Sequence, residues 1–383
     1  MYMLLLAVIY LAFISLGLPD SLLGSGWPVM SGDIGAPLSF AGIVTMIISG
    51  GTIVSSLFSY KLTMKLGTGL LTALSVLLTA AALFGFSVSG SFAELCLWAI
   101  PYGLGAGAID AALNNYVAVN YSSRHMSWLH SFWGVGTIMS PYIMSYALTT
   151  AAGWSGGYRA VSLIQLAIAV IMFLSLPMWK RTSETSEKTE SRNKTLKDVL
   201  KIKGVIFVLA AFFAYCAADS TVMLWSSSYL VEARGVGTEL AAAFASLFFI
   251  GITAGRFLTG IIANRFGDFK LIMTGASIMT AGIILITLPF EITSLIGFVV
   301  IGLGCAPVYP SIIHSTPFNF GAENSQAIIG IQMASAYVGS TFMPPLFGLI
   351  AEHIEIRLMP LFLIFFTALL VIMIGRLKKC VKR

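Results

Sequence analysis

The sequence predicts an all-α, polytopic membrane protein whose twelve transmembrane helices form two pseudo-symmetric six-helix bundles. Three observations predict this fold class: an apolar composition, apolar runs of spanning length, and an internal repeat. Of the 383 residues, 57% are hydrophobic and 10% are charged, and the mean hydropathy is +0.91. A soluble protein carries about 25% charged residues. The composition therefore excludes an ordinary soluble domain.

Apolar runs of about 20 residues, the length that crosses the hydrocarbon core, recur along the whole chain. The first run has no basic n-region and no small-residue cleavage site, so we interpret it as a span and not as a signal peptide. The predicted spans are 3–29, 38–60, 68–88, 92–119, 127–150, 156–178, 204–230, 239–262, 269–289, 293–315, 324–351 and 357–377.

The distribution of basic residues predicts the orientation. With both termini in the cytoplasm, these spans place 18 of the 22 Lys and Arg residues on the cytoplasmic side, with Arg256 at an inner helix end, and leave Arg159, Arg234 and Arg357 outside. Cytoplasmic loops carry such an excess of Lys and Arg. We therefore expect a multi-pass protein of the cell inner (plasma) membrane. The net charge of +6 comes from basic residues that collect beside the membrane segments and set the topology. No nucleic-acid partner is therefore expected.

One long hydrophilic stretch, 179–203, divides the chain. Its Ser, Thr, Glu and Lys content is typical of a flexible cytoplasmic linker. The predicted organisation is an N-terminal six-helix bundle, 1–178, this linker, and a C-terminal six-helix bundle, 204–383, with a short basic cytoplasmic tail.

The two halves repeat at an offset of about 200 residues. Asp20-Ser21 recurs as Asp219-Ser220, the Gly-Leu-Gly at 103–105 recurs at 302–304, and 136–141 recurs at 339–344. Parallel repeats are a common construction among transporters, in which substrate binds near mid-membrane between the halves. The repeat thus predicts a pocket between the bundles.

Three acids lie deep inside predicted spans, away from their ends: Asp20, Asp110 and Asp219. A carboxylate at the bilayer centre costs about 2.5 to 3.5 kcal/mol by insertion scales, so such a residue is expected to face a water-filled cavity or a partner. We assign proton coupling to Asp110 and Asp20, and substrate binding to Asp219. The alternative for Asp110 is a structural, hydrogen-bonded acid. Asp20 follows Pro19 in a bent first span, where it could instead bind backbone amides that the bend frees.

Polar and aromatic side chains at similar depth are the remaining candidates for substrate binding, because sugar-sized pockets combine flat apolar faces with a few placed donors and acceptors. For the aromatic residues the alternative is an interfacial belt, and His130 could be a packing histidine. The set comprises Trp27, Asn114, Asn115, His130, Trp133, Trp225, Tyr309, Gln332 and Tyr337.

The stretch 255–268, G-R-F-L-T-G-I-I-A-N-R-F-G-D, resembles the inner-loop signature of the major facilitator superfamily. The resemblance implies that Arg256, Arg265 and Asp268 form a charge cluster that holds a cytoplasmic gate. The alternative is ordinary positive-inside anchoring. The copy in the first half, 60–67, carries no acid, and Ser56 stands where Arg256 would be.

Within that superfamily, the pattern at 105–114 and the L-H-S-F-W-G-V-G at 129–136 resemble the fucose permease group of sugar–proton symporters, as do 302–310 and 332–344. By this resemblance Asp110 takes the place of the group's protonatable carboxylate, and His130 that of a sugar-contacting glutamine. Trp133 falls where the group has a polar residue. Gly24 falls where the group has an aspartate, with Asp20 one turn earlier.

These observations predict a secondary active transporter that takes up a monosaccharide or similar small polar solute with protons, by alternating access. A proton-coupled exporter of drugs or metabolites is the alternative. No catalytic, nucleotide-binding or metal-ligand spacing occurs, so we expect neither an enzyme nor a cofactor; the coupling ion is a proton, or else sodium. Expected partners are the solute and the lipid bilayer, and a monomer is expected. An intramembrane enzyme or a nutrient sensor belongs to a different class of protein, for which the sequence offers no support.

Overall fold

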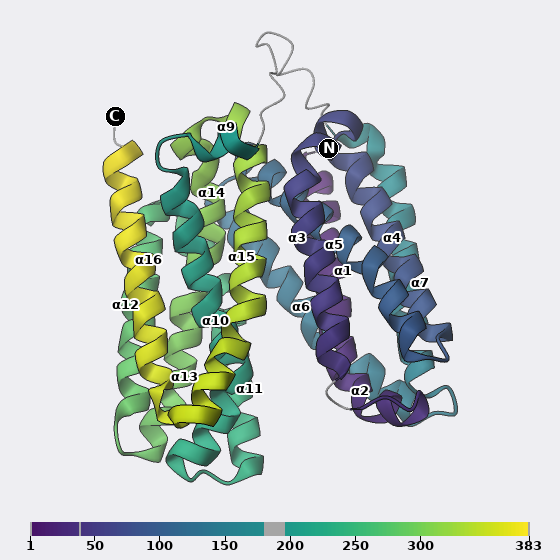
Figure 1. Ribbon diagram of the computed structural model, residues 1–383. Helices are drawn as coiled ribbons and strands as arrows, with labels where there is room; N and C mark the ends of the chain where they lie inside the picture. Colours follow the sequence, from purple (N-terminus) through teal and green to yellow (C-terminus); the bar gives the residue numbers. More distant parts are fainter. Residues whose placement is uncertain (1, 38–39, 180–195, 382–383) are drawn as a thin grey trace. The chain divides into compact units, whose positions relative to one another are not determined.

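The computed structural model describes residues 2–37, 40–179 and 196–381, and within these ranges the regular elements are all helical. The helices divide between two compact units (Figure 1). The N-terminal unit takes the chain up to Tyr116 and resumes at Leu129, whereas the C-terminal unit takes Val117–Trp128 and everything from α9 onward. An all-α polytopic fold is therefore confirmed.

The N-terminal unit is built on six predicted spans, each of which is helical. The helices are α1 (Tyr2–Asp20), α2 (Leu22–Asp33), α3 (Ala41–Leu66), α4 (Thr68–Val88), α5 (Phe92–Asn120), α6 (Ser123–Leu148) and α7 (Gly153–Ser175), followed by the short η2 (Leu176–Met178). The first span is divided, because α1 ends at Asp20 and α2 begins after the turn at Ser21. This break gives Asp20 its position at a helix end.

The C-terminal unit contains the other six spans. Its helices are α9 (Leu196–Leu200), α10 (Val205–Arg234), α11 (Thr238–Phe266), α12 (Asp268–Thr287), α13 (Glu291–Cys305), α14 (Val308–Phe320), α15 (Ala322–Ile350) and α16 (Met359–Val381), with the short η3 (Ala351–Glu355) and η4 (Ile356–Leu358) between the last two. The tenth span is divided at Ala306 and Pro307, because proline removes a backbone donor and disturbs the preceding helical turn.

Several helices are longer than the predicted spans. The stretch ending at Gly67, expected as a loop, is the last turn of α3, and a single glycine connects it to α4. Gly267 connects α11 to α12 in the same way. Both glycines have positive φ, +78° and +73°, a conformation that costs glycine little. The two connections repeat at the offset seen in the sequence.

Nine segments of the described chain are long and apolar enough to cross a membrane by length and composition. One of them, Ala322–Val381, has 60 residues, which as a single helix would extend about 90 Å, three times the hydrocarbon thickness of about 30 Å. It contains two helices, α15 and α16, joined by η3 and η4. The helices α6 and α11 occupy the remaining two predicted spans.

Equivalent close contacts between helix backbones occur inside each of the two units. A Cβ atom on Gly103 of α5 would lie 2.2 Å from the carbonyl oxygen of Ile48 on α3, and one on Gly302 of α13 would lie 2.4 Å from that of Phe248 on α11. Only glycine permits such an approach. Gly339 of α15 packs on the backbone of α10 in the same manner. The internal repeat is thus a repeat of packing as well as of sequence.

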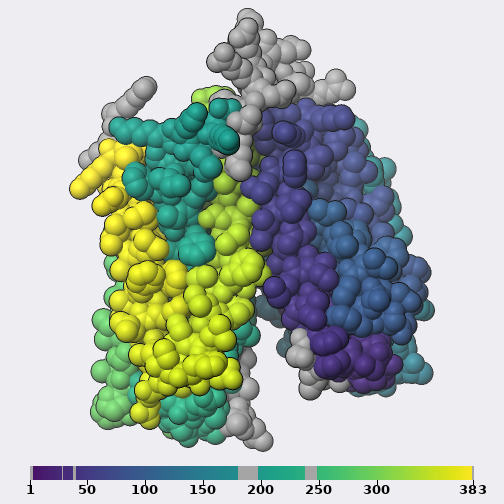
Figure 2. All heavy atoms as spheres, viewed as in Figure 1, coloured from purple at the N-terminus to yellow at the C-terminus, as the bar shows by residue number. Residues whose placement is uncertain are grey.

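Apolar side chains cover the outward faces of the helices. On α16 the exposed residues include Leu361, Phe365 and Ile372, and Figure 2 shows this helix, in yellow, along one face of the C-terminal unit. Such a surface suits lipid. Most of the linker predicted at 179–203 lies outside the described residues, as do the last two residues of the basic tail.

Candidate functional site

A buried chain of hydrogen bonds connects Asp110, Asn114 and His130 in the N-terminal unit. The Asn114 amide nitrogen donates to the Asp110 side chain (2.7 Å) and to the Asp110 carbonyl (3.0 Å), and His130 Nε2 lies 3.1 Å from the Asn114 amide oxygen. Asp110 and Asn114 lie one turn apart on α5, and His130 comes from α6. At most 7% of each residue is exposed.

The partners decide the direction of this chain. Because the Asn114 nitrogen faces two Asp110 oxygens, its amide oxygen is the acceptor that faces His130. The His130 Nε2 atom must therefore carry a hydrogen and donate it. The Phe13 ring of α1 packs edge-on against the imidazole, with ring centroids 5.3 Å apart, and fixes its plane. The Asp110 carboxyl group is thus linked through an amide to an imidazole on the neighbouring helix.

A second carboxylate, Asp20 of α1, accepts hydrogen bonds from two donors, one on α5 and one on α6. Tyr102 Oη of α5 donates to Asp20 Oδ1 (3.0 Å), and Trp133 Nε1 of α6 donates to Oδ2 (2.8 Å). Tyr102 is buried, Trp133 is half-buried and Asp20 is exposed. The hydrogen bonds stabilise the ionised carboxylate while it remains accessible.

Both hydrogen-bonded groups lie against the same side of α1, the first through the contact of His130 with Phe13 and the second through Asp20 itself. Phe13 at the first group and Asp20 at the second are seven residues apart, which is two turns of helix, so they lie on one face about 10 Å apart. On α6, His130 and Trp133 are three residues apart and face the same neighbour. α1, α5 and α6 therefore present two polar levels to one another within an apolar unit.

Replacing Trp133 by Phe tests the second level. A smaller aromatic ring remains while the donor to Asp20 is lost, and one hydrogen bond to a charged group is worth about 1.5 to 3 kcal/mol. We expect a lower midpoint in thermal unfolding of the purified protein. Tyr142→Phe, which alters an exposed hydroxyl on the same helix, is the matched control and should leave the midpoint unchanged. An unchanged midpoint for Trp133→Phe would show that this bond adds nothing to stability.

In the C-terminal unit, the repeat mate Asp219 has a cationic neighbour. Arg256 of α11 attracts it electrostatically, and Tyr215 and Cys305 are its other polar neighbours. Tyr215 Oη also donates to the Cys305 carbonyl oxygen (3.2 Å). Asp219 Oδ1 is buried, and within the described residues it has no hydrogen-bond partner. This oxygen can accept a hydrogen bond from a ligand.

The other C-terminal candidates lie on α10, α14 and α15. Gln332 is fully buried and its side-chain oxygen accepts from Thr316 (3.0 Å), while its Nε2 atom has no partner within the described residues. Tyr309 packs against the rings of Phe212 and Tyr215. Tyr337 is half-buried. Gln332 Nε2 is thus a buried hydrogen-bond donor, whereas Asp219 Oδ1 is a buried acceptor.

The surroundings of the last three candidates, Trp225, Trp27 and Asn115, differ from one another. Trp225 Nε1 donates to the Pro344 carbonyl (2.9 Å), and its ring borders a cavity of about 480 Å³ that Glu232 and Glu352 also line. Trp27 is 4% exposed and belongs to the apolar core of the N-terminal unit, a position that suits packing. Asn115 is buried beside Asn114 on α5.

The three residues proposed for gating also have different surroundings. Arg256 is buried near Asp219, whereas Arg265 is exposed at the end of α11. Asp268, in the first turn of α12, forms an ion pair with His314 at 2.7 Å. The gate stays a prediction, and the structure assigns Asp268 a histidine partner that the spacing of the motif did not indicate.

Several polar partners were not candidates from the sequence. Tyr102 and Ser123 match no motif, and tertiary packing brings each to a carboxylate on another helix. Tyr215 lies one turn before Asp219 on α10, so helical spacing could have identified it as a neighbour of that acid. Gln165 and Ser15 form a further buried pair between α7 and α1. Within the described residues no three His, Cys, Asp or Glu side chains converge as metal ligands.

The fold and these polar levels define a polytopic transport protein of two repeated helical units. The chain belongs to the Major Facilitator Superfamily, whose family model matches residues 9–316 and 207–379. It is therefore a transporter and not an enzyme.

Similar proteins agree with this assignment. An uncharacterized MFS-type transporter of Yersinia pestis is 25% identical over 89% of this chain and 88% of that protein. Among solved structures, FucP in the outward conformation has a TM-score of 0.83 at 16% identity, covering 98% of both chains. The proton:xylose symporter XylE has a TM-score of 0.78 at 14% identity, covering 98% of this chain and 95% of that one. The resemblance to the fucose permease group is confirmed at the level of the fold.

Proposed function

We propose that this transporter takes up a monosaccharide, or a similar small polar solute, together with protons by alternating access. The observation that carries the proposal is the buried chain from Asp110 through Asn114 to His130. An acid retained inside a membrane protein costs free energy unless a cavity or a partner uses it. Asp110 is the proton carrier, and Asp20 assists it from the second polar level.

The polar character of the candidates favours a hydroxyl-rich solute. Asn115 and Trp133 in the N-terminal unit, with Gln332 and Asp219 in the C-terminal unit, offer amide and carboxylate groups beside flat aromatic faces, the combination that suits a sugar. Among the similar structures, FucP is the E. coli fucose:proton symporter, and XylE is a proton:xylose symporter. Export of lipophilic compounds would favour a wider apolar lining.

One proton per solute supplies enough free energy for uptake. A charge that moves down 100 mV yields about 2.3 kcal/mol, and at about 1.4 kcal/mol per decade this drives accumulation of about 1.6 decades. A single titrating carboxyl group therefore suffices.

The test is transport by the purified protein. A thermal-shift screen against sugars, nucleosides, amino acids and drugs identifies a ligand, and proteoliposomes then measure its uptake with and without an inward proton gradient, in sodium-free buffer. We expect a sugar to stabilise the protein and to accumulate only with acid outside. Accumulation that requires sodium, or outward pumping of a drug, would replace the proposal by sodium coupling or by export.

The proposed location is the inner (plasma) membrane with both termini cytoplasmic. This orientation puts Lys61, Lys65 and Arg265 on the cytoplasmic side, in keeping with the positive-inside rule. Labelling of a cysteine introduced at Lys65 by an impermeant reagent should require permeabilised cells.

A further inference from the structure

The connection between α5 and α6 is held by the C-terminal unit. Residues Val117–Trp128, here called the strap, belong to that unit, although the chain on both sides of them belongs to the N-terminal unit. The strap is thus a covalent tie between the two units. Whether its contacts hold or release affects any movement of one unit relative to the other.

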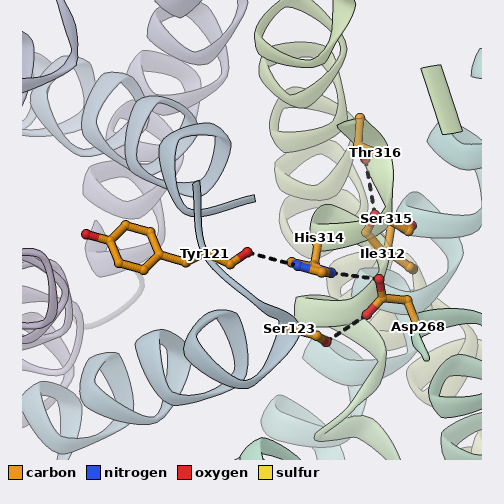
Figure 3. Close-up of polar contacts among 7 residues, drawn as sticks. All are labelled: Tyr121, Ser123, Asp268, Ile312, His314, Ser315 and Thr316. Carbon is orange, nitrogen blue, oxygen red and sulfur yellow. Dashed lines mark hydrogen bonds and ion pairs between the residues drawn. The ribbon is translucent and has the colours of Figure 1, made fainter. Parts of the chain in front are cut away.

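Three polar contacts anchor the first part of the strap (Figure 3). Ser123 Oγ donates to Asp268 Oδ1 (2.7 Å), and Asp268 Oδ2 lies 2.7 Å from His314 Nδ1. His314 Nε2 lies 3.2 Å from the Tyr121 carbonyl oxygen. The side chains of His314 and Asp268 are 20% and 16% exposed, so the pair is shielded but reachable by protons.

These contacts define the protonation state that fits them. The Tyr121 carbonyl can only accept, so His314 Nε2 must carry a hydrogen. The Asp268 carboxylate also accepts, from Ser123 and from His314 Nδ1, so Nδ1 must carry a hydrogen too. The arrangement is that of an imidazolium between two acceptors. A neutral imidazole carries a single ring hydrogen, and the carboxylate retains it on Nδ1, so deprotonation leaves an Nε2 lone pair against the Tyr121 carbonyl oxygen and breaks the contact with the strap.

A second anchor holds the end of the strap. Trp128 Nε1 donates to the Phe257 carbonyl oxygen (3.4 Å), and the indole occupies the space where a Cβ on Gly260 would lie, 2.2 Å from its nitrogen. Arg124 stacks over this indole, with its guanidinium carbon 5.7 Å from the ring centroid. The strap is therefore held at its middle and at its end, and among the described residues the ion pair lies in the first anchor.

Among the described residues, the titratable group that faces His314 is Asp268 of α12, and the Tyr121 carbonyl of the strap is its other polar contact. On the strap itself, His125 packs edge-on against the Tyr121 ring at 5.8 Å. Burial, and then the nearby charge of Arg124, lowers the pKa of His125. His125 is therefore the other histidine whose titration must be separated from that of His314.

The number of spans places these groups at one membrane face. The strap follows the fourth span, Asp268 follows the eighth, and His314 lies six residues before the end of the tenth. After an even number of spans the chain returns to the side of its N-terminus. On the proposed orientation that side is the cytoplasm.

We infer that His314 is a positioning residue for transport, which in its protonated form ties the strap to Asp268 and on deprotonation releases it. The inference rests on the proposed function for its consequence. Proton-coupled uptake acidifies the cytoplasm, and a tie that tightens as cytoplasmic pH falls slows further turnover. His314 thereby acts as a brake on acid loading.

Hydrogen–deuterium exchange of the full-length protein tests the tie without any solute or gradient. Exchange of the peptide spanning 117–128 is measured at about pH 5.5 and about pH 8, on either side of the ordinary imidazole pKa of about 6.5, and corrected for the intrinsic chemical rate. Because a charge-assisted hydrogen bond is lost, we expect exchange to be about tenfold faster at the higher pH.

The variants separate the two histidines. In His314→Gln and in Asp268→Asn the strap should exchange fast at both pH values, whereas His125→Gln should keep the wild-type difference. Equal exchange at both pH values in the wild type overturns the inference, as does a difference that survives both His314→Gln and Asp268→Asn or disappears in His125→Gln. Since no transport is measured, these outcomes are independent of whether the solute is a sugar or the coupling ion a proton.

Discussion

Replacing Asp110 by Asn is expected to abolish proton-driven accumulation while sparing counterflow exchange. Asparagine has nearly the same shape and keeps an acceptor for the Asn114 amide, but it cannot bind and release a proton. Accumulation of about 1.6 decades at 100 mV should therefore fall to equilibration, and exchange of labelled for unlabelled solute should continue. The measurement is uptake of the identified solute into proteoliposomes, with and without an imposed gradient.

Glu94→Gln is the matched control for this variant. Glu94 lies on the same helix, is exposed, and accepts a hydrogen bond from the Gly90 backbone (2.8 Å), so the substitution removes one negative charge far from the buried chain. It should accumulate solute as the wild type does. Full accumulation in Asp110→Asn would remove this carboxylate from the coupling mechanism and leave Asp20 as the remaining candidate in the N-terminal unit.

Replacing Gly103 by Val is expected to prevent the N-terminal unit from folding. Even the Cβ atom alone would lie 2.2 Å from the Ile48 carbonyl oxygen and 3.0 Å from two further backbone atoms of Ile48. A helix backbone cannot yield as a side-chain end can, so α3 and α5 must move apart. Overpacking by one methylene costs typically about 1 to 3 kcal/mol, and Val adds three carbons. The readout is the yield of monodisperse protein in size-exclusion chromatography.

Two further substitutions give this prediction its controls. Gly302→Val should fail in the same way, because its Cβ would meet the Phe248 carbonyl at 2.4 Å. Gly50→Val, on α3 itself, should express normally, since nothing lies within 4 Å of its Cβ position. Normal yield of Gly103→Val would show that the helices of this unit can separate without loss of the fold.

The repeat explains why so much of the fold could be predicted. A membrane helix satisfies its backbone hydrogen-bonding groups within its own segment, so length and hydropathy alone locate the spans. The glycines recur where helices meet, and their spacing recurs with them. The sequence could not show that α3 and α11 run on to Gly67 and Gly267, because helices continue beyond the hydrocarbon core into the polar region where hydropathy no longer marks them.

Asp20 and Asp219 illustrate where sequence reasoning stops. They are repeat mates with the same following serine, yet Asp20 is held by two neutral donors, Tyr102 and Trp133, whereas Asp219 faces the cation of Arg256. Tyr102, Trp133 and Arg256 each come from another helix, more than thirty positions away from the acid that they contact. Local sequence therefore identified the acids but not their partners.

By itself, the sequence determined the class of protein, the twelve spans, the repeat and the acids inside the membrane, because each of these follows from local composition and period. The tertiary structure alone decided that Asn114 joins Asp110 to His130 and that His314 pairs with Asp268. Hydrogen bonds extend about 3 Å, and which side chains come that close depends on how helices distant in sequence rotate and pack.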